Sequence, residues 1–229
     1  SHEGVEPLGT DLNLLHIFHQ LGVRVIGLTH VRRNMAGDGG VFAPQGSSRH
    51  GLTAFGKDVV RECEALRILV DLAHINPAGF DDILSIATRP LAVSHSNARK
   101  FYNIERNMSD DQIRAVGGAG GVIGVNAVLV SPAKEETTID RYIDHVEHIA
   151  ALAGMDAVAI GFDFFERIFN RLAPAERAVL GHIHFVPDLN NHSHARNVTR
   201  RLIERGWPDA DIEKFLYGNW LRLLRATLA

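Results

Sequence analysis

The chain has 229 residues with 27 acidic and 24 basic side chains, a net charge of −3, which excludes the clustered Lys and Arg excess of nucleic-acid binders. Hydrophobic residues make up 45% and charged residues 22%, a composition typical of a globular domain and not of a disordered tail. No apolar run reaches the ~18–20 residues of a membrane span, and the single cysteine, Cys63, excludes a disulfide framework and a cysteine-based zinc site.

Short apolar segments alternate with amphipathic segments along the chain. The pattern predicts strands over residues 23–28, 68–73, 91–94, 121–125 and 157–162. It predicts helices over 12–21, 52–66, 77–86, 139–153, 195–205 and 209–228, a helix beginning at Ser109, and a polar loop over 47–51. Apolar strands interleaved with helices indicate βα units and a parallel sheet covered by helices. Because no low-complexity linker interrupts residues 1–229, we expect a single domain.

Histidine or aspartate follows four of the predicted strands. These residues are His30, His74, His95 and Asp163. Reactive groups of parallel α/β folds lie beyond the carboxyl ends of the strands, so we expect these side chains to converge. Imidazole and carboxylate groups are ligands of zinc and similar divalent ions, and such an ion activates water for amide hydrolysis. Arg106 is a candidate to bind a substrate carboxylate with its two-pronged guanidinium group.

Longer stretches carry more specific information. They are LGVRVIGLTHVRRN (21–34), GLTAFGKDVVRECEALRILVDLAH (51–74), RPLAVSHSNARKFYNIERNMSDDQIRAV (89–116), HVEHIAALAG (145–154), AVAIGFDF (157–164) and GNWLRLL (218–224). In this order and spacing they resemble the renal (membrane) dipeptidase family, from Glu3 to about Arg225. The resemblance implies a binuclear-zinc dipeptidase on a (β/α)8 TIM-like barrel.

The resemblance also implies the metal ligands. By its place in the pattern, Glu3 corresponds to the carboxylate that bridges the two zinc ions. His74 and His95 correspond to the two histidines of the second zinc ion.

Three further residues correspond to substrate-handling groups of the family. His30 corresponds to the residue that faces the substrate and supports the tetrahedral oxyanion. Arg106 corresponds to the group that receives the C-terminal carboxylate. Asp163 corresponds to the carboxylate that contacts the attacking water or the substrate amine and handles its proton.

The sequence departs from the family pattern in two places. The family's first strand carries a His-x-Asp pair that completes the other zinc site, and this chain contains no such pair. We therefore expect the first βα units of the barrel to be missing and at most one zinc ion to be fully liganded by this chain. The second departure is Asp163-Phe164-Phe165-Glu166, where the family often has Asp-Phe-Asp-Gly, which affects substrate preference.

Several interpretations follow. The chain is expected to be part of a longer protein, with a two-chain barrel or a homodimer across the open edge as alternatives. The expected activity is hydrolysis of small dipeptides, with tolerance of D-residues at the C-terminal position. Another metal-dependent amidohydrolase, such as a lactam or lactone hydrolase, and a metal-poor binding subunit are the alternative functions. With no leader sequence visible, a cytoplasmic location is expected.

Overall fold

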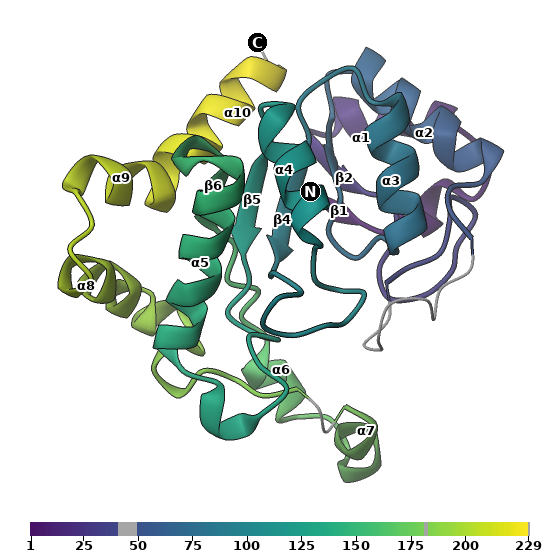
Figure 1. Cartoon of the computed structure of the whole chain (residues 1–229). Coiled ribbons are helices and arrows are strands. Elements are labelled where there is room, and N and C mark those ends of the chain that lie inside the picture. The colour runs from purple at the N-terminus through teal and green to yellow at the C-terminus, as the bar shows by residue number, and fades with distance from the viewer. Residues whose placement is uncertain (41–49, 181–182, 229) are drawn as a thin grey trace.

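The computed structural model describes residues 1–40, 50–180 and 183–228. Its strands pair in parallel in one six-stranded sheet with the order β1-β2-β3-β4-β5-β6 (Figure 1). The strands are β1 (His2–Glu3), β2 (Val25–Gly27), β3 (Leu69–Asp71), β4 (Ala92–Ser96), β5 (Val122–Val125) and β6 (Val158–Ile160). The order follows the chain without reversal, so each crossover returns the chain to the next position in the sheet.

The helices connect these strands and close the chain. They are α1 (Asn13–Gln20), α2 (Ala54–Ala65), α3 (Pro77–Ile86), α4 (Asp110–Gly118), α5 (Ile139–Ala153), α6 (Glu166–Phe169), α7 (Pro174–Val179), α8 (Arg196–Glu204), α9 (Asp209–Glu213) and α10 (Asn219–Leu228). The five predicted strands and the helices α1–α5 and α8 are confirmed. The bounds of α3 and α5 agree to the residue, because Asn76 and Thr138 cap the first-turn amides of Gly79 and Arg141.

The two faces of the sheet are covered differently. On one face, alternate strand residues pack with the helices in the main core, which includes Ile26, Val70, Val93, Ile123 and Val158 from the strands and Val59, Ile83, Ile113, Val146 from α2–α5. The residues of opposite pleat form a smaller cluster with α10, made of Leu69, Ala92, Val122, Ala159 and Leu223. Because successive strand side chains point to opposite faces, this division of residues follows from the pleat.

The described residues do not form the closed barrel that the resemblance implies. Their sheet is open and has six strands. One of these strands, β1, was not predicted, because two residues with polar side chains carry no apolar pattern. It is identified by its partners: His2 pairs with Ile26 and Glu3 with Gly27.

Three other differences concern helices. The segment predicted as one helix over 209–228 is α9 and α10 separated by a π-helical turn, Lys214–Gly218. The short helices α6 and α7 were not predicted, because each spans less than two turns. Of the predicted loop over 47–51, residues 47–49 lie outside the described part of the chain.

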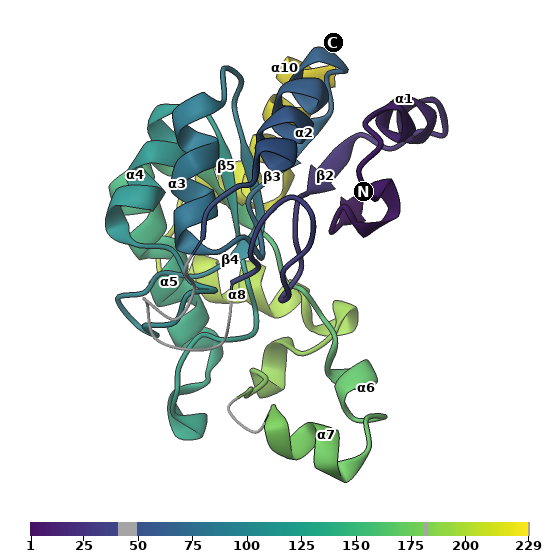
Figure 2. The same ribbon diagram turned by 90° about the vertical axis from the view of Figure 1, so that its right-hand side faces the viewer.

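Helices α6 and α7 lie beyond the carboxyl ends of the strands, and α10 lies toward the opposite end (Figures 1 and 2). Isolated pairing of Val128 with Phe185 ties the segment after α7 to the loop that follows β5. In the described residues, no helix has the length and apolar character needed to cross a membrane.

His145 of α5 joins three parts of the main core. Its Nδ1 accepts a hydrogen bond from the Ala98 amide at 3.0 Å, and its Nε2 donates to the Val130 carbonyl at 2.8 Å. The ring is fully buried, and burial lowers its pKa to about 4. His145 therefore links α5 to the loops after β4 and β5 as a neutral structural group.

We expect the stability supplied by His145 to fall as the pH drops from 6.5 toward 4. The pKa is about 4 in the folded protein against an ordinary 6.5, so the unfolded chain binds a proton first in this window. The free energy of unfolding should fall by about 2 kcal/mol between pH 8 and pH 5 from this residue. Chemical denaturation at both pH values, on the parent and a His145→Gln variant, measures the difference. Equal pH dependence of the two proteins would contradict this role.

Candidate metal centre

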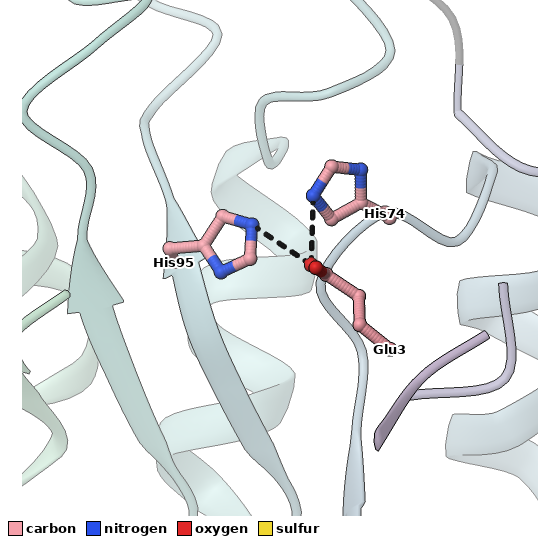
Figure 3. Close-up of side chains that lie close together, drawn as sticks. All are labelled: Glu3, His74 and His95. Atoms are coloured by element: carbon pink, nitrogen blue, oxygen red, sulfur yellow. Dashed lines mark ion pairs between the residues drawn. The ribbon is translucent and has the colours of Figure 1, made fainter. Parts of the chain in front are cut away.

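Three side chains from separate segments converge at the carboxyl ends of the strands. The Oε1 atom of Glu3 lies 2.9 Å from Nε2 of His74 and 3.4 Å from Nε2 of His95 (Figure 3). All the donor atoms of this group lie within 4.8 Å of one another. Two ligands of a tetrahedral ion, each ~2.0–2.1 Å away, are separated by roughly 3.3 Å, so these separations suit a single metal ion.

Each of the three side chains is positioned by a strand or by the turn after one. Glu3 ends β1, and the edge pairing continues beyond it through a hydrogen bond from the Gly4 amide to the Gly27 carbonyl at 3.0 Å. His95 lies within β4. His74 follows β3 in a left-handed backbone conformation, with φ of 65°, and its carbonyl accepts a 2.6 Å hydrogen bond from the Gly40 amide. Such a conformation is costly for a side-chain-bearing residue and is often found at functional sites.

Both imidazoles are held in the form that a metal ion requires. Burial lowers the pKa of His74 well below its ordinary value, and the nearby Arg106 lowers it further. Burial also lowers the pKa of His95, although Asp163 and Glu3 act in the opposite direction. At neutral pH the rings are therefore uncharged and can donate a lone pair to a cation.

The Nε2 atom of His95 is buried and has no hydrogen-bond partner. Its nearest carboxylate oxygens are those of Glu3 at 3.4 Å and Asp163 at 3.9 Å. The other ring nitrogen, Nδ1, lies 2.9 Å from the Ser94 hydroxyl. A proton on Nδ1, donated to that hydroxyl, leaves the Nε2 lone pair free for a metal ion. The residues present therefore fit a divalent metal.

Asp163 lies beside the metal ligands at the end of β6. Like His74, it has a left-handed backbone, with φ of 55°. Its Oδ2 accepts a 3.2 Å hydrogen bond from Nδ2 of Asn126. The side-chain oxygen of the buried Asn126 accepts a hydrogen bond from the Val128 amide at 2.7 Å. Asn126 thus connects the carboxylate of Asp163 to the loop after β5.

A cavity of about 390 Å³ opens beside this centre, and Glu3, His30, His74, Arg106 and Asp163 all line it. The exposed ring of His30 stacks on His74 with 4.2 Å between the centroids and 27° between the planes. Arg106 is only 5% exposed, its Nε has no hydrogen-bond partner, and it forms no ion pair with any described residue. Burial lowers its pKa to about 10, so the guanidinium remains charged at neutral pH and is available to an anionic ligand.

The structure adds three polar residues that the sequence analysis did not select: Asp71, Ser94 and Asn126. Asp71 is buried and accepts hydrogen bonds from the amides of Ala73 at 3.0 Å and Ser94 at 2.8 Å. The sequence signal that could have identified Asp71 is an acidic residue inside the apolar run Ile68–Ala73. Asn126 follows β5 directly, so the strand-end argument used for the other residues would have found it.

Comparison with known proteins gives the family. The family model described as membrane dipeptidase, peptidase family M19, matches residues 1–229. The chain belongs to this family. Its enzymes are metallodipeptidases, which agrees with the possible metal-ligand group Glu3, His74 and His95.

Individual relatives support the assignment. Dipeptidase tcpJ of Claviceps purpurea is 28% identical over 225 residues, 97% of this chain and 49% of tcpJ. An uncharacterized protein in the pqqA 5′ region of Klebsiella pneumoniae is 33% identical over 229 residues, 97% of this chain and 78% of that protein. A metallopeptidase of Rhodobacter sphaeroides, crystallised with a phosphinate mimic of L-Ala-D-Ala, is 27% identical with a TM-score of 0.85, covering 99% of this chain and 62% of that one. The chain thus spans about half the length of tcpJ.

Replacing His95 with alanine should weaken zinc binding strongly. Loss of a group that only contacts a metal ligand typically costs ~10–100-fold in metal affinity, and loss of a ligand should cost more. The matched control is His148→Ala, because the His148 side chain is equally exposed, 12% for each, but pairs with Asp110 on the helical face. Competition with a metal-buffering chelator gives both affinities. Equal zinc affinities in the two variants would rule out His95 as a ligand.

Proposed function

We propose that the protein is a zinc-dependent dipeptidase that hydrolyses the peptide bond of small dipeptides. The observation that carries the proposal is one cavity lined by Glu3 and His74 of the candidate metal-ligand group and by a buried arginine without an ionic partner among the described residues. A cation centre and a fixed guanidinium group match the reacting carbonyl and the terminal carboxylate of a dipeptide. The peptide-mimic complex of the Rhodobacter relative supports this substrate class and extends the proposal to D-residues at the C-terminal position.

Glu3, His74 and His95 would hold a zinc ion. When bound, zinc acts as a Lewis acid that polarises the scissile carbonyl and makes water a better nucleophile near neutral pH. The resemblance implies a second zinc ion in the family site, which Glu3 would also help to hold. This second ion would need ligands besides Glu3, and the 229-residue sequence contains no His-x-Asp motif to supply them.

Arg106 would bind the substrate carboxylate. Its guanidinium group is buried, so an incoming carboxylate is paired in a site of low dielectric, where the interaction is strong. Because the arginine is anchored in the loop between β4 and α4, it fixes the distance from the terminal carboxylate to the strand ends that carry His74 and His95.

Asp163 would act as the general base and then as the general acid. Its carboxylate would take a proton from the attacking water as the oxygen bonds to the carbonyl carbon, and would return that proton to the amine nitrogen as the C–N bond breaks. His30 lines the same cavity and would donate a hydrogen bond to the carbonyl oxygen as negative charge develops there.

We further propose that the open sheet is part of a (β/α)8 barrel. The strands keep chain order without the reversal that marks a doubly wound sheet, and α1–α5 cover one face. The similarity to longer metallopeptidase chains supports this arrangement.

Exchange of Arg106 for lysine should raise KM for dipeptides with a free carboxylate by roughly 10–100-fold, with a small effect on kcat. An ammonium group keeps the charge but cannot make the paired hydrogen bonds. Steady-state kinetics on free and C-terminally amidated dipeptides measures this. For amidated dipeptides, kcat/KM should be low in the parent and nearly unchanged by the exchange. An equal loss of kcat/KM on free and amidated dipeptides would exclude carboxylate binding.

Exchange of Asp163 for asparagine should lower kcat by roughly 10²–10⁴, with little change in KM or zinc content. The amide has the shape of the carboxylate but cannot accept the proton. Kinetics together with metal analysis tests the role, and Asp163→Glu, which retains a base, should recover part of the rate. Turnover of the asparagine variant at the parental rate would exclude Asp163 as the base.

A further inference from the structure

The cavity beside the metal-ligand group has two chemically different sets of lining residues. One set is polar and comprises Glu3, His30, His74, Arg106 and Asp163. The other set is apolar and comprises Val31, Val128, Leu129, Phe165, Ile168, Leu180 and Ile183. The described residues of the apolar set include no charged or hydrogen-bonding side chain. The polar set is accounted for by the proposed chemistry, whereas the apolar set has no role in it.

The apolar wall is a packed structure. Val128, Leu129 and Ile183 are buried members of one cluster with Ile104, and Phe165 packs against it. Behind the wall, the Phe185 ring meets Phe165 with 5.1 Å between centroids and Phe169 with 5.3 Å. The pairing of Val128 with Phe185 joins the two segments that form the wall. These contacts hold the apolar surface in a fixed position.

Two side-chain hydrogen bonds hold the loop after β5 at Val128. Nδ2 of Asn97 donates to the Val128 carbonyl at 2.7 Å, and Oδ1 of Asn126 accepts from the Val128 amide at 2.7 Å. The next residue, Leu129, has a left-handed backbone with φ of 60°. A leucine in this conformation is strained, and such strain persists where surrounding contacts enforce it at ligand-binding sites.

These features determine which side chains the cavity accepts. A charged side chain placed against the wall would lose hydration without gaining a partner from the wall residues, which is strongly unfavourable. An alanine side chain would leave most of the apolar surface uncovered. A bulky apolar side chain would bury that surface, and each methylene in such a pocket is worth roughly 10-fold or more in discrimination.

We propose that this wall is a specificity pocket, and that the preferred dipeptides carry one bulky apolar side chain of the leucine or phenylalanine class. The assignment of the ligand as a dipeptide rests on the proposed function. The apolar selectivity rests on the wall itself and applies to binding as well as to turnover.

Two measurements test the proposal on the parent protein. Metal-free protein should bind Leu-Ala or Ala-Leu at least about 10-fold more tightly than Ala-Ala in calorimetric titrations, and the corresponding lysine dipeptides more weakly than Ala-Ala. With zinc added, kcat/KM should follow the same order. Comparing Leu-Ala with Ala-Leu identifies which residue of the dipeptide occupies the pocket.

A pair of variants tests the wall directly. Ile168 lines the cavity and is 66% exposed, so Ile168→Glu places a carboxylate at the mouth with little risk to folding. It should reduce the leucine preference by about 10-fold and improve binding of the lysine dipeptide. Ile203→Glu is the matched control, because Ile203 is 58% exposed on α8 and does not line the cavity; it should leave both values unchanged.

The outcomes separate this proposal from the function on which it rests. Hydrolysis of Ala-Ala and leucine dipeptides with equal kcat/KM and equal binding overturns the pocket and leaves the dipeptidase proposal standing. Selective binding of leucine dipeptides without zinc-dependent hydrolysis overturns the dipeptidase proposal and leaves the pocket standing. Equal changes in Ile168→Glu and Ile203→Glu also overturn the pocket.

Discussion

The pairing of β1 with β2 is the constraint on which the candidate metal centre depends. β1 has only two residues, and its register sets Glu3 opposite Gly27. The hydrogen bond from Val5 to the Leu28 carbonyl, 3.1 Å long, extends the pairing past the strand. From this position the Glu3 carboxylate meets imidazoles carried by β4 and by the turn after β3. Without the pairing, the candidate ligand group would keep two neutral imidazoles and lose its one carboxylate.

Burial gives the surrounding groups their charge states. It favours neutral imidazoles, while Arg106 stays protonated because its pKa, although lowered, is about 10 and is supported by Asp163, Glu3 and Asp71. The centre therefore combines free lone pairs with a fixed positive charge a short distance away. Such a combination suits a substrate that brings both a carbonyl group and a carboxylate. Burial of Arg106 and of the two imidazole rings strengthens both interactions, since the effective dielectric constant around buried groups is low.

Close backbone contact beneath the site supports this arrangement. A Cβ atom at Gly124 or Gly161 would lie 2.2 Å from the Ser94 carbonyl oxygen, so the ends of β4, β5 and β6 approach one another only because both residues are glycine. This approach sets the distance between His95 and Asp163. The left-handed conformation of Asp163 then turns the chain from β6 toward α6, which begins the segment that carries the apolar wall. Positioning of the metal ligands and shaping of the cavity thus share one set of contacts.

The sequence by itself determined the elements with strong local signals. The amphipathic pattern predicted α3 and α5 to the residue, and apolar runs predicted β2–β6. The strand-end position selected His30, His74, His95 and Asp163. Arg106 was a candidate from its chemistry, and the family resemblance assigned its role and added Glu3. Only the tertiary structure decided the rest: that a two-residue strand aligns Glu3, that Asn126 holds Asp163, and that the sheet of the described residues is open. It also decided that the loop after β5, the segment around α6 and the residues after α7 together form an apolar wall. These features depend on contacts between residues distant in the chain, whose geometry leaves no periodic pattern in the sequence.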